Sequence, residues 1–422
     1  MKLNLKAKTI ISIALFVVIF VTLILIASFC DFKISQLLTK GVLENGEYFA
    51  HDFFGVMLES VGCIPIYLMI AFILCVLFWS CLKLWNKKPY NIICAVVCAI
   101  GVVVACWIAI KDSAGYIFEH TLARTGDIAG NLEAVDKFEH SMAVYGVEAV
   151  FALVMGALAI LATMHFNKDV LKKLLIFSLA TAAAVALANV LIMIIKNPVG
   201  RMRFRAINSD LGQQLINDST SGVKGFTAWY VSNGQPAQGV LESFEKTYGV
   251  TDAFKSFPSG HTCSAGTMYA LIMIPTLFGY NGKKEKLGAT IACWAVPVVY
   301  TMLVAISRIM VGAHYMSDVT FGGTLSFVCV IIAWEIFICK GSHFFALFPK
   351  LQKVKATDNA NTEVDGDVND GEEHTLDSAE THENSFNAVN IDNEMEFPSQ
   401  ADSGVDEQAT ESVVAESDSA EQ

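Results

Sequence analysis

The stretch that begins at Ser307 holds the residues best suited to chemistry. It reads Ser307-Arg308-Ile-Met-Val-Gly-Ala-His314-Tyr-Met-Ser-Asp318 and lies between two apolar runs. His314 and Asp318 are four residues apart, so a helix would place them on one face, where they can touch. A carboxylate at one imidazole nitrogen fixes the tautomer and leaves the other nitrogen free as a base or nucleophile. Arg308 adds a planar guanidinium that suits phosphate oxygens. An interfacial ion pair is the alternative interpretation.

A second polar stretch, Phe257-Pro258-Ser259-Gly260-His261, comes directly before another apolar run. Pro and Ser suit a helix start, and Gly lets the backbone approach a ligand closely. The open N–H groups at such a helix end form an anion site, and His261 would point at the bound anion. Taken alone, the stretch is equally consistent with a simple helix cap and an interfacial histidine.

Four cations lie within ten residues where a further apolar run ends: Lys196, Arg201, Arg203 and Arg205. Pro198 and Gly200 between them would break the helix. Snorkelling side chains or contact with lipid headgroups explain such a cluster as well as a ligand site does.

Together the three stretches supply at least three cations, helix-end amides and two histidines, one of which has a carboxylate nearby. Phosphoryl transfer depends mainly on positioning and on charge stabilisation, and this combination provides both. No acidic cluster in these loops offers ligands for magnesium or zinc. We therefore expect phosphoryl chemistry without a metal or any other cofactor.

The elements that must position these residues are membrane helices. The chain is 54% hydrophobic and only 17% charged, whereas a soluble domain has about 25% charged residues. A span needs roughly 20 mostly apolar residues, and only helices or closed barrels satisfy their backbone in lipid. The apolar runs predict eight helical spans, near 9–29, 61–82, 91–110, 145–165, 174–195, 262–280, 288–306 and 319–339.

The lysine distribution predicts an orientation for these spans. If the N-terminus is cytoplasmic, short lysine-rich connections such as 83–88, 168–173 and 283–286 all fall on the cytoplasmic side, as the positive-inside rule requires. Both termini are then cytoplasmic, and the three polar stretches share the outer face. We expect the plasma membrane as the location.

The C-terminal tail accounts for the acidic net charge. Residues 356–422 contain 20 Asp and Glu and no Lys or Arg, which leaves 29 basic and 21 acidic residues in the rest of the chain. A segment so poor in large apolar residues cannot offset its ordering entropy, so we expect it to be disordered and cytoplasmic. It is either simply solvated or a docking segment for a cytoplasmic partner. The eleven cysteines lie mostly in apolar runs, where packing explains them.

The three stretches resemble the signature of the type 2 phosphatidic acid phosphatase (PAP2) superfamily, which is K-x6-RP, then PSGH, then SR-x5-H-x3-D. The chain has Lys196-x6-Arg203, then Pro258–His261, then Ser307-Arg308-x5-His314-x3-Asp318. The one departure is Phe204, where the family usually has proline. That position carries no catalytic group, so the departure concerns local backbone shape and headgroup fit.

The resemblance implies a role for each matching residue. His314 would be the nucleophile that forms a phosphohistidine, Asp318 would orient it, and His261 would protonate the leaving group. The remaining matches would hold the phosphate: Lys196, Arg203, Ser259, Gly260 and Arg308. The family's six-helix core would correspond to residues 89–341, preceded by two additional transmembrane helices in 1–88 and followed by the tail 342–422.

These observations predict an all-α membrane enzyme that hydrolyses a lipid phosphomonoester or diphosphate without a metal. Phosphatidate, phosphatidylglycerophosphate and a polyprenyl diphosphate are equally consistent substrates. A transferase that uses the same site is the first alternative, and a non-catalytic anion-binding scaffold is the second. Nothing in the chain predicts nucleic-acid binding.

Overall fold

The computed structural model describes residues 5–85, 88–118 and 128–347, and within these ranges the chain is helical with no strand. This confirms the predicted all-α fold. The acidic segment 348–422 lies outside the described residues. The first six residues of the predicted tail form a short helix, α15 (Ser342–Leu347).

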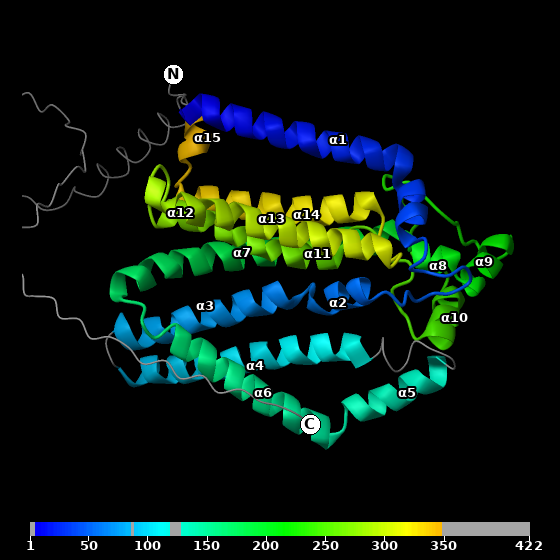
Figure 1. The fold of residues 1–422 in the computed structure, drawn as a ribbon, viewed down its shortest axis with the longest axis horizontal. Helices are drawn as coiled ribbons and strands as arrows, with labels where there is room; N and C mark the ends of the chain where they lie inside the picture. Colours follow the sequence, from blue (N-terminus) through cyan, green and yellow to red (C-terminus); the bar gives the residue numbers. More distant parts are fainter. Residues whose placement is uncertain (1–4, 86–87, 119–127, 348–422) are drawn as a thin grey trace, which may run out of the picture. The chain divides into compact units, whose positions relative to one another are not determined.

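Long helices dominate the fold (Figure 1). Seven helical stretches in the described part of the chain are long and apolar enough to cross a membrane, which makes the chain a multi-pass membrane protein. Those seven are Leu5–Thr39, Phe53–Lys83, Pro89–Phe118, Met142–Ala162, Lys168–Asn208, Lys284–Met310 and Met316–Ile338.

The remaining predicted span, 262–280, is helical but is not one regular α-helix. It consists of α11 (Gly260–Ala265), the 3-10 helix η2 (Gly266–Met273) and α12 (Ile274–Leu277), which follow one another without a break. This segment packs against α13 (Leu287–Met310) and α14 (Met316–Ala333). The predicted number of eight is therefore approximate, because one of the eight segments changes helix type along its length.

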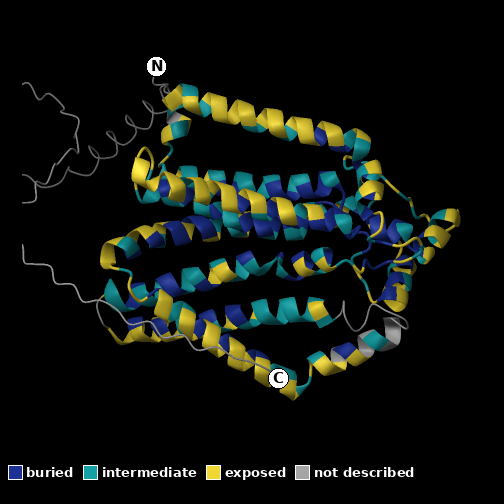
Figure 2. Ribbon diagram, viewed as in Figure 1, coloured by how far each residue is buried: buried dark blue, intermediate teal, exposed yellow. Residues whose placement is uncertain are grey.

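The first helix packs in a different part of the bundle from the two that follow it. The helix α1 (Leu5–Thr39) packs along α14, and α2 (Phe53–Val61) packs against α4 (Pro89–Phe118) and α13. The helix α3 (Ile64–Lys83) packs against α4 and α7 (Lys168–Val199). Figure 2 shows that α1 and α6 (Met142–Ala162) expose most of their apolar residues, as lipid-facing helices do.

Short helices gather at one end of the bundle, where α1 ends and α2 begins (Figure 1). They are α8 (Phe204–Asn208), α9 (Asp210–Asn217) and α10 (Gln238–Tyr248), with α5 (Ile128–Glu139) beyond them. A buried core of aromatic and aliphatic residues joins α8 and α10 to the segment after α1. The three polar stretches predicted to act together all lie at this end.

Candidate active site

Local helix signals place each of the three stretches. The helix α7 ends at Gly200, which has φ 58° and so terminates the helix in the left-handed region that glycine favours. Ser259 is the N-cap of α11, and Tyr315 is the N-cap of α14. Each polar stretch is therefore a helix end, and the structure brings these ends together.

The close approach of α11 and α14 depends on a glycine. A Cβ atom at Gly322 would lie 2.4 Å from the backbone oxygen of Ser259. Ser259 N also donates to the backbone oxygen of Asp318 over 3.0 Å. The second and third polar stretches are thus joined backbone to backbone.

His314 is buried and held by a backbone carbonyl. Its Nδ1 lies 2.6 Å from the oxygen of Ser256, and 3.7 Å from Asp318 Oδ2. Because a carbonyl only accepts, Nδ1 carries the proton and Nε2 keeps its lone pair. We expected the Asp318 carboxylate to fix this tautomer, but the hydrogen bond to Ser256 does so in the structure.

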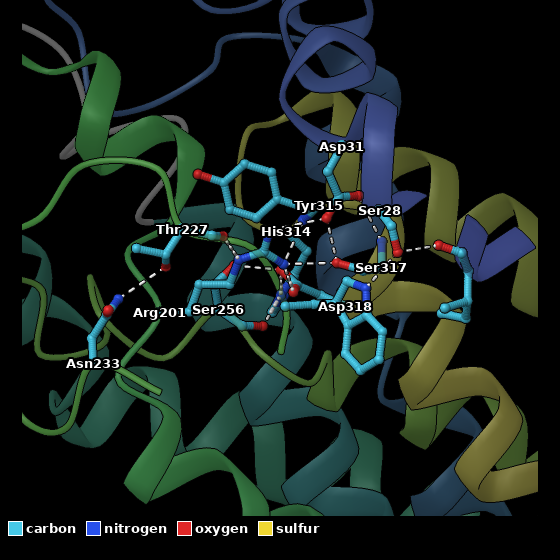
Figure 3. A network of polar contacts seen from close by, with 12 residues as sticks. Ser28, Asp31, Arg201, Thr227, Asn233, Ser256, His314, Tyr315, Ser317 and Asp318 are labelled. Carbon is cyan, nitrogen blue, oxygen red and sulfur yellow. Dashed lines mark hydrogen bonds and ion pairs between the residues drawn. The ribbon is translucent and has the colours of Figure 1, made fainter. Parts of the chain in front are cut away.

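Asp318 is fully buried, and both of its oxygens are engaged (Figure 3). Oδ1 accepts from Arg201 Nη1 over 2.5 Å. Oδ2 accepts from the Ser256 hydroxyl and from the Tyr315 amide, the latter over 2.8 Å. Asp318 therefore acts on His314 mainly through Ser256, whose carbonyl and hydroxyl contact the two residues.

Arg201 and Asp31 belong to the same network, and the sequence did not single them out as site residues. Arg201 Nη2 lies 2.9 Å from Asp31 Oδ2, and both side chains are buried. Asp31 comes from α1 and directly follows the predicted first span. A charged residue at that depth is a general signal of function, but it does not identify a partner.

The structure has a cavity of about 490 Å³ at the predicted motifs, although His314 and Asp318 are not among the residues that line it. Arg203, Arg308 and His261 line it, and two carboxylates face the arginines. Arg203 Nη2 lies 2.6 Å from Asp252 Oδ2, and Arg308 Nη1 lies 2.9 Å from Glu59 Oε1. Glu59 and Asp252 could not be identified from the sequence, because neither belongs to one of the three polar stretches.

Several buried polar atoms around the cavity lack a hydrogen-bond partner among the described residues. They are Nε of Arg203, Nε and Nη2 of Arg308, and Nε2 of His261. Buried donors of this kind are costly unless they bind something. Their convergence on one cavity fits a ligand rich in oxygen and negative charge.

Lys196, Ser259 and Gly260 lie close together at the start of α11. Lys196 Nζ would be 3.6 Å from a Cβ atom built at Gly260, so the ammonium lies directly over this glycine. The Ser259 hydroxyl contacts Thr262 Oγ1 at 3.0 Å and accepts from the Thr262 amide. It therefore caps the helix here, as one of the two interpretations of this stretch proposed.

Burial and neighbouring charges together set the ionisation of His314 and Asp252. Burial, and then the cations Arg203, Arg308 and Lys196, lower the pKa of His314 well below its usual range. Burial alone would raise the pKa of Asp252, but Arg203, Arg205 and Lys196 outweigh it and lower that pKa to about 2. His314 is therefore neutral and Asp252 ionised near pH 7.

Arg205 has a different role from the other cations of its stretch. It is buried, and its guanidinium lies 4.9 Å from the ring centre of Tyr48 and 5.7 Å from that of Phe49. Its backbone amide donates to the oxygen of Gly312 over 2.8 Å. Arg205 lines the cavity but also ties α8 to the turn before His314.

Phe204, the departure from the expected proline, is the first residue of α8. Arg203 before it has φ −69° and ψ 150°, the extended backbone that a residue before proline also adopts. The ring lies 5.5 Å from that of Phe32 and 6.4 Å from that of Tyr315. The backbone shape in question is therefore compatible with either residue.

Metal-ligating side chains in the described ranges come together in one place away from this site. Glu335, Cys339 and His343 lie beyond the C-terminal end of α14, and Glu335 follows Asp318 by 17 residues, or about 26 Å of helix. Glu335 accepts hydrogen bonds there from the amides of His343 and Phe344. The absence of a metal in the reaction stays a prediction.

Comparison with known protein families supports the resemblance to the PAP2 superfamily. The model of the PAP2 superfamily matches residues 173–340, a region that contains all three motifs. Members of that superfamily are phosphatases, so the match supports a hydrolase in general. Neither the curated proteins nor the solved structures gave a match.

Proposed function

Since residues 173–340 match the PAP2 superfamily, we propose that this membrane protein removes phosphate from a phosphorylated lipid through a phosphohistidine at His314. The observation that carries the proposal is the hydrogen bond from His314 Nδ1 to the Ser256 carbonyl, 2.6 Å long. It leaves Nε2 as the atom with a lone pair, which is what a nucleophile needs.

The neighbouring cations support phosphate as the group attacked. Arg203, Arg308 and Lys196 all act electrostatically on His314, so a phosphoryl group beside its ring would lie in their field. Nε2 would form a bond to phosphorus as the bond to the lipid oxygen breaks. The cations would hold the three other phosphate oxygens, on which the negative charge is spread.

We assign the proton transfers to His261, which would carry the extra proton only beside a bound phosphate dianion, since burial and then Arg308 lower its pKa well below its usual range. Its Nε2 is buried, faces the same cavity as Arg203 and Arg308, and has no hydrogen-bond partner among the described residues. It would protonate the leaving lipid oxygen and then take a proton from the water that hydrolyses the phosphohistidine. Phosphate is released, and His314 returns to its neutral form.

The main test is phosphate release by the purified full-length protein in detergent micelles. The substrates would be phosphatidate, phosphatidylglycerophosphate and undecaprenyl diphosphate. We expect release from at least one of them, inhibition by vanadate and no effect of EDTA. His314→Ala should abolish release, whereas His165→Ala, which changes an exposed histidine far from the motifs in sequence, should not.

Two further results would contradict parts of the proposal. Full activity of His314→Ala would refute the nucleophile, and activity lost with EDTA and restored by magnesium would refute the metal-free reaction. His261→Ala should lower release from an alkyl phosphate by about 10²- to 10⁴-fold. It should lower release from p-nitrophenyl phosphate much less, because that leaving group needs no proton.

The location of the site also remains a proposal. The lysine-rich connections support a cytoplasmic position for both termini and an extracytoplasmic position for His314 in the plasma membrane. Hydrolysis of a substrate added outside intact cells, with none after His314→Ala, is the expected result. Product analysis with an added alcohol acceptor distinguishes hydrolysis from phosphate transfer.

A further inference from the structure

Arg201 is fully buried, and each of its guanidinium nitrogens has a partner. Nε donates to the oxygen of Thr227 over 2.9 Å, and Nη1 donates to Ser317 Oγ over 2.7 Å as well as to Asp318. Nη2 donates to Asp31 over 2.9 Å. No nitrogen remains for phosphate, so Arg201 differs from Arg203 and Arg308, whose guanidinium nitrogens are partly unpaired.

Asp31 holds the other edge of this network (Figure 3). It is 3% exposed, and Oδ1 accepts from the Ser317 amide over 2.9 Å. Oδ2 accepts from the Ser317 hydroxyl and from Arg201. Asp31 thereby contacts the residue directly before Asp318, and it contacts the guanidinium that binds the Asp318 carboxylate.

The charges show why two carboxylates share one guanidinium. Burial of a carboxylate is costly unless it is paired and hydrogen-bonded, and both Asp31 and Asp318 meet that condition through Arg201. With both carboxylates ionised, the three side chains together carry one net negative charge. Because Arg201 binds Asp31 as well as Asp318, it does not neutralise both carboxylates, and one negative charge is retained next to His314. A positive imidazole would form there during phosphate transfer.

The end of α1 is docked by further contacts around Asp31. The ring of Phe32 lies 5.1 Å from that of Phe226, and Trp229 Nε1 donates to Ser28 Oγ over 2.9 Å. These contacts join α1 to the loop that supplies Thr227 to Arg201. Yet α1 lies outside residues 173–340, the region that matches the family.

We propose that Asp31 is a positioning residue for the phosphatase reaction, and that α1 is therefore part of the catalytic unit. Asp31 holds Arg201 and Ser317, which hold Asp318, and Asp318 with Ser256 holds His314. The inference rests on the proposed function, because it concerns the same reaction. It adds a residue outside the family motifs and assigns a role to the first additional helix.

The test compares kcat and KM of Asp31→Asn with those of the wild type, on whichever substrate the full-length protein hydrolyses. We expect kcat to fall by about 10- to 100-fold, because small misplacements of reacting groups have effects of this size. KM should change little, since Arg203, Arg308 and Lys196 are untouched. Asp31→Glu, which keeps the charge, should recover part of kcat.

Ser28→Ala is the matched control. It removes the hydrogen bond from Trp229 to α1 but leaves Arg201 and its partners intact. If docking of α1 were the whole contribution of Asp31, Ser28→Ala would lower kcat as much as Asp31→Asn. We expect near wild-type kcat for Ser28→Ala.

Ser317→Ala covers the case in which Asp31→Asn does not fold. It removes a hydroxyl that contacts both Arg201 and Asp31 without changing any charge, and it should lower kcat by about 3- to 10-fold. Wild-type kcat in Asp31→Asn or in Ser317→Ala overturns this inference, and so does an equal loss in Ser28→Ala. Each of these three results leaves the proposed phosphatase function standing. A wild type that is inactive on every substrate would overturn both the proposed function and the role of Asp31.

Discussion

Replacement of Glu59 by Gln tests how Arg308 is held at the cavity. Glu59 Oε1 and Arg308 Nη1 are 2.9 Å apart, and both side chains are buried. At this separation, the Coulomb attraction is about 6 kcal/mol for an effective dielectric constant of roughly 20. Much of it is offset by the cost of burying the two charges. Glu59→Gln keeps the side-chain size but leaves the Arg308 charge without this carboxylate, so we expect a loss of about 3–5 kcal/mol in stability.

The same substitution should strengthen anion binding. Glu59 places a negative charge in the cavity that Arg203, His261 and Arg308 line, and this charge repels a phosphate-like dianion. Its removal should tighten vanadate binding by about tenfold, which corresponds to roughly 1.4 kcal/mol. The variant should therefore be less stable when empty and gain more stability from the ligand.

Thermal unfolding in detergent across a vanadate titration measures both effects. Glu44→Gln is the charge-matched control, because Glu44 is exposed and lies outside the cavity lining. It should unfold and bind vanadate like the wild type. A Glu59→Gln protein as stable as the wild type, or one that binds vanadate more weakly, would refute the reasoning.

Three further predictions concern the surroundings of the site. Gly322→Ala should lower the free energy of unfolding by about 1–3 kcal/mol and lower kcat, because its Cβ would lie 2.4 Å from the Ser259 oxygen. Gly323→Ala is the control and should be tolerated, since its Cβ would have no contact closer than 3.5 Å. Equal unfolding temperatures of the two variants would contradict this prediction. Phe204→Pro should keep kcat but lose about 2–4 kcal/mol of stability with its ring packing, and a stable but inactive variant would argue against this account. The pKa of His314 is lower in the folded state than its unfolded-state value of about 6.5. Below about pH 6.5 the unfolded chain therefore binds the proton more readily than the folded chain. Stability should fall as pH decreases from 7 to 5. His314→Gln should weaken this pH dependence in thermal unfolding, and an unchanged slope would show that other groups cause it.

The positions of the helices and of the three motifs could be predicted from the sequence, because both are local properties. Apolar runs of about 20 residues specify spans, and polar residues at their ends mark the stretches that lie at the bundle surface. Ser259 illustrates the strength of such signals, since a serine before a helix start is an N-cap in the structure as in the pattern. The motif residues His261, Arg203 and Arg308 do line one cavity.

The contacts between distant helices could not be predicted in this way. Asp31 and Ser317 are 286 residues apart, and Arg201 and Asp31 are 170 residues apart. Hydrophobic periodicity shows that a helix is buried in lipid or protein, but it does not show which helix is its neighbour. For the same reason, the sequence suggested Asp318 as the partner of His314 Nδ1, whereas a backbone carbonyl from another stretch takes that place.

The helix α1, which lies outside the matched region, and the departure at Phe204 meet in the structure. Phe204 starts α8 at a position where proline would also fit, so the backbone does not require the aromatic residue. Its ring instead fills the space between Phe32 of α1 and Tyr315, the N-cap of α14. The Arg201 guanidinium in turn lies over the Tyr315 ring, with its central carbon 4.1 Å from the ring centre. A smaller residue at position 204 would leave a gap between α1 and the turn that carries His314. The phenylalanine is therefore best explained as a packing partner of α1, which lies outside the matched residues 173–340.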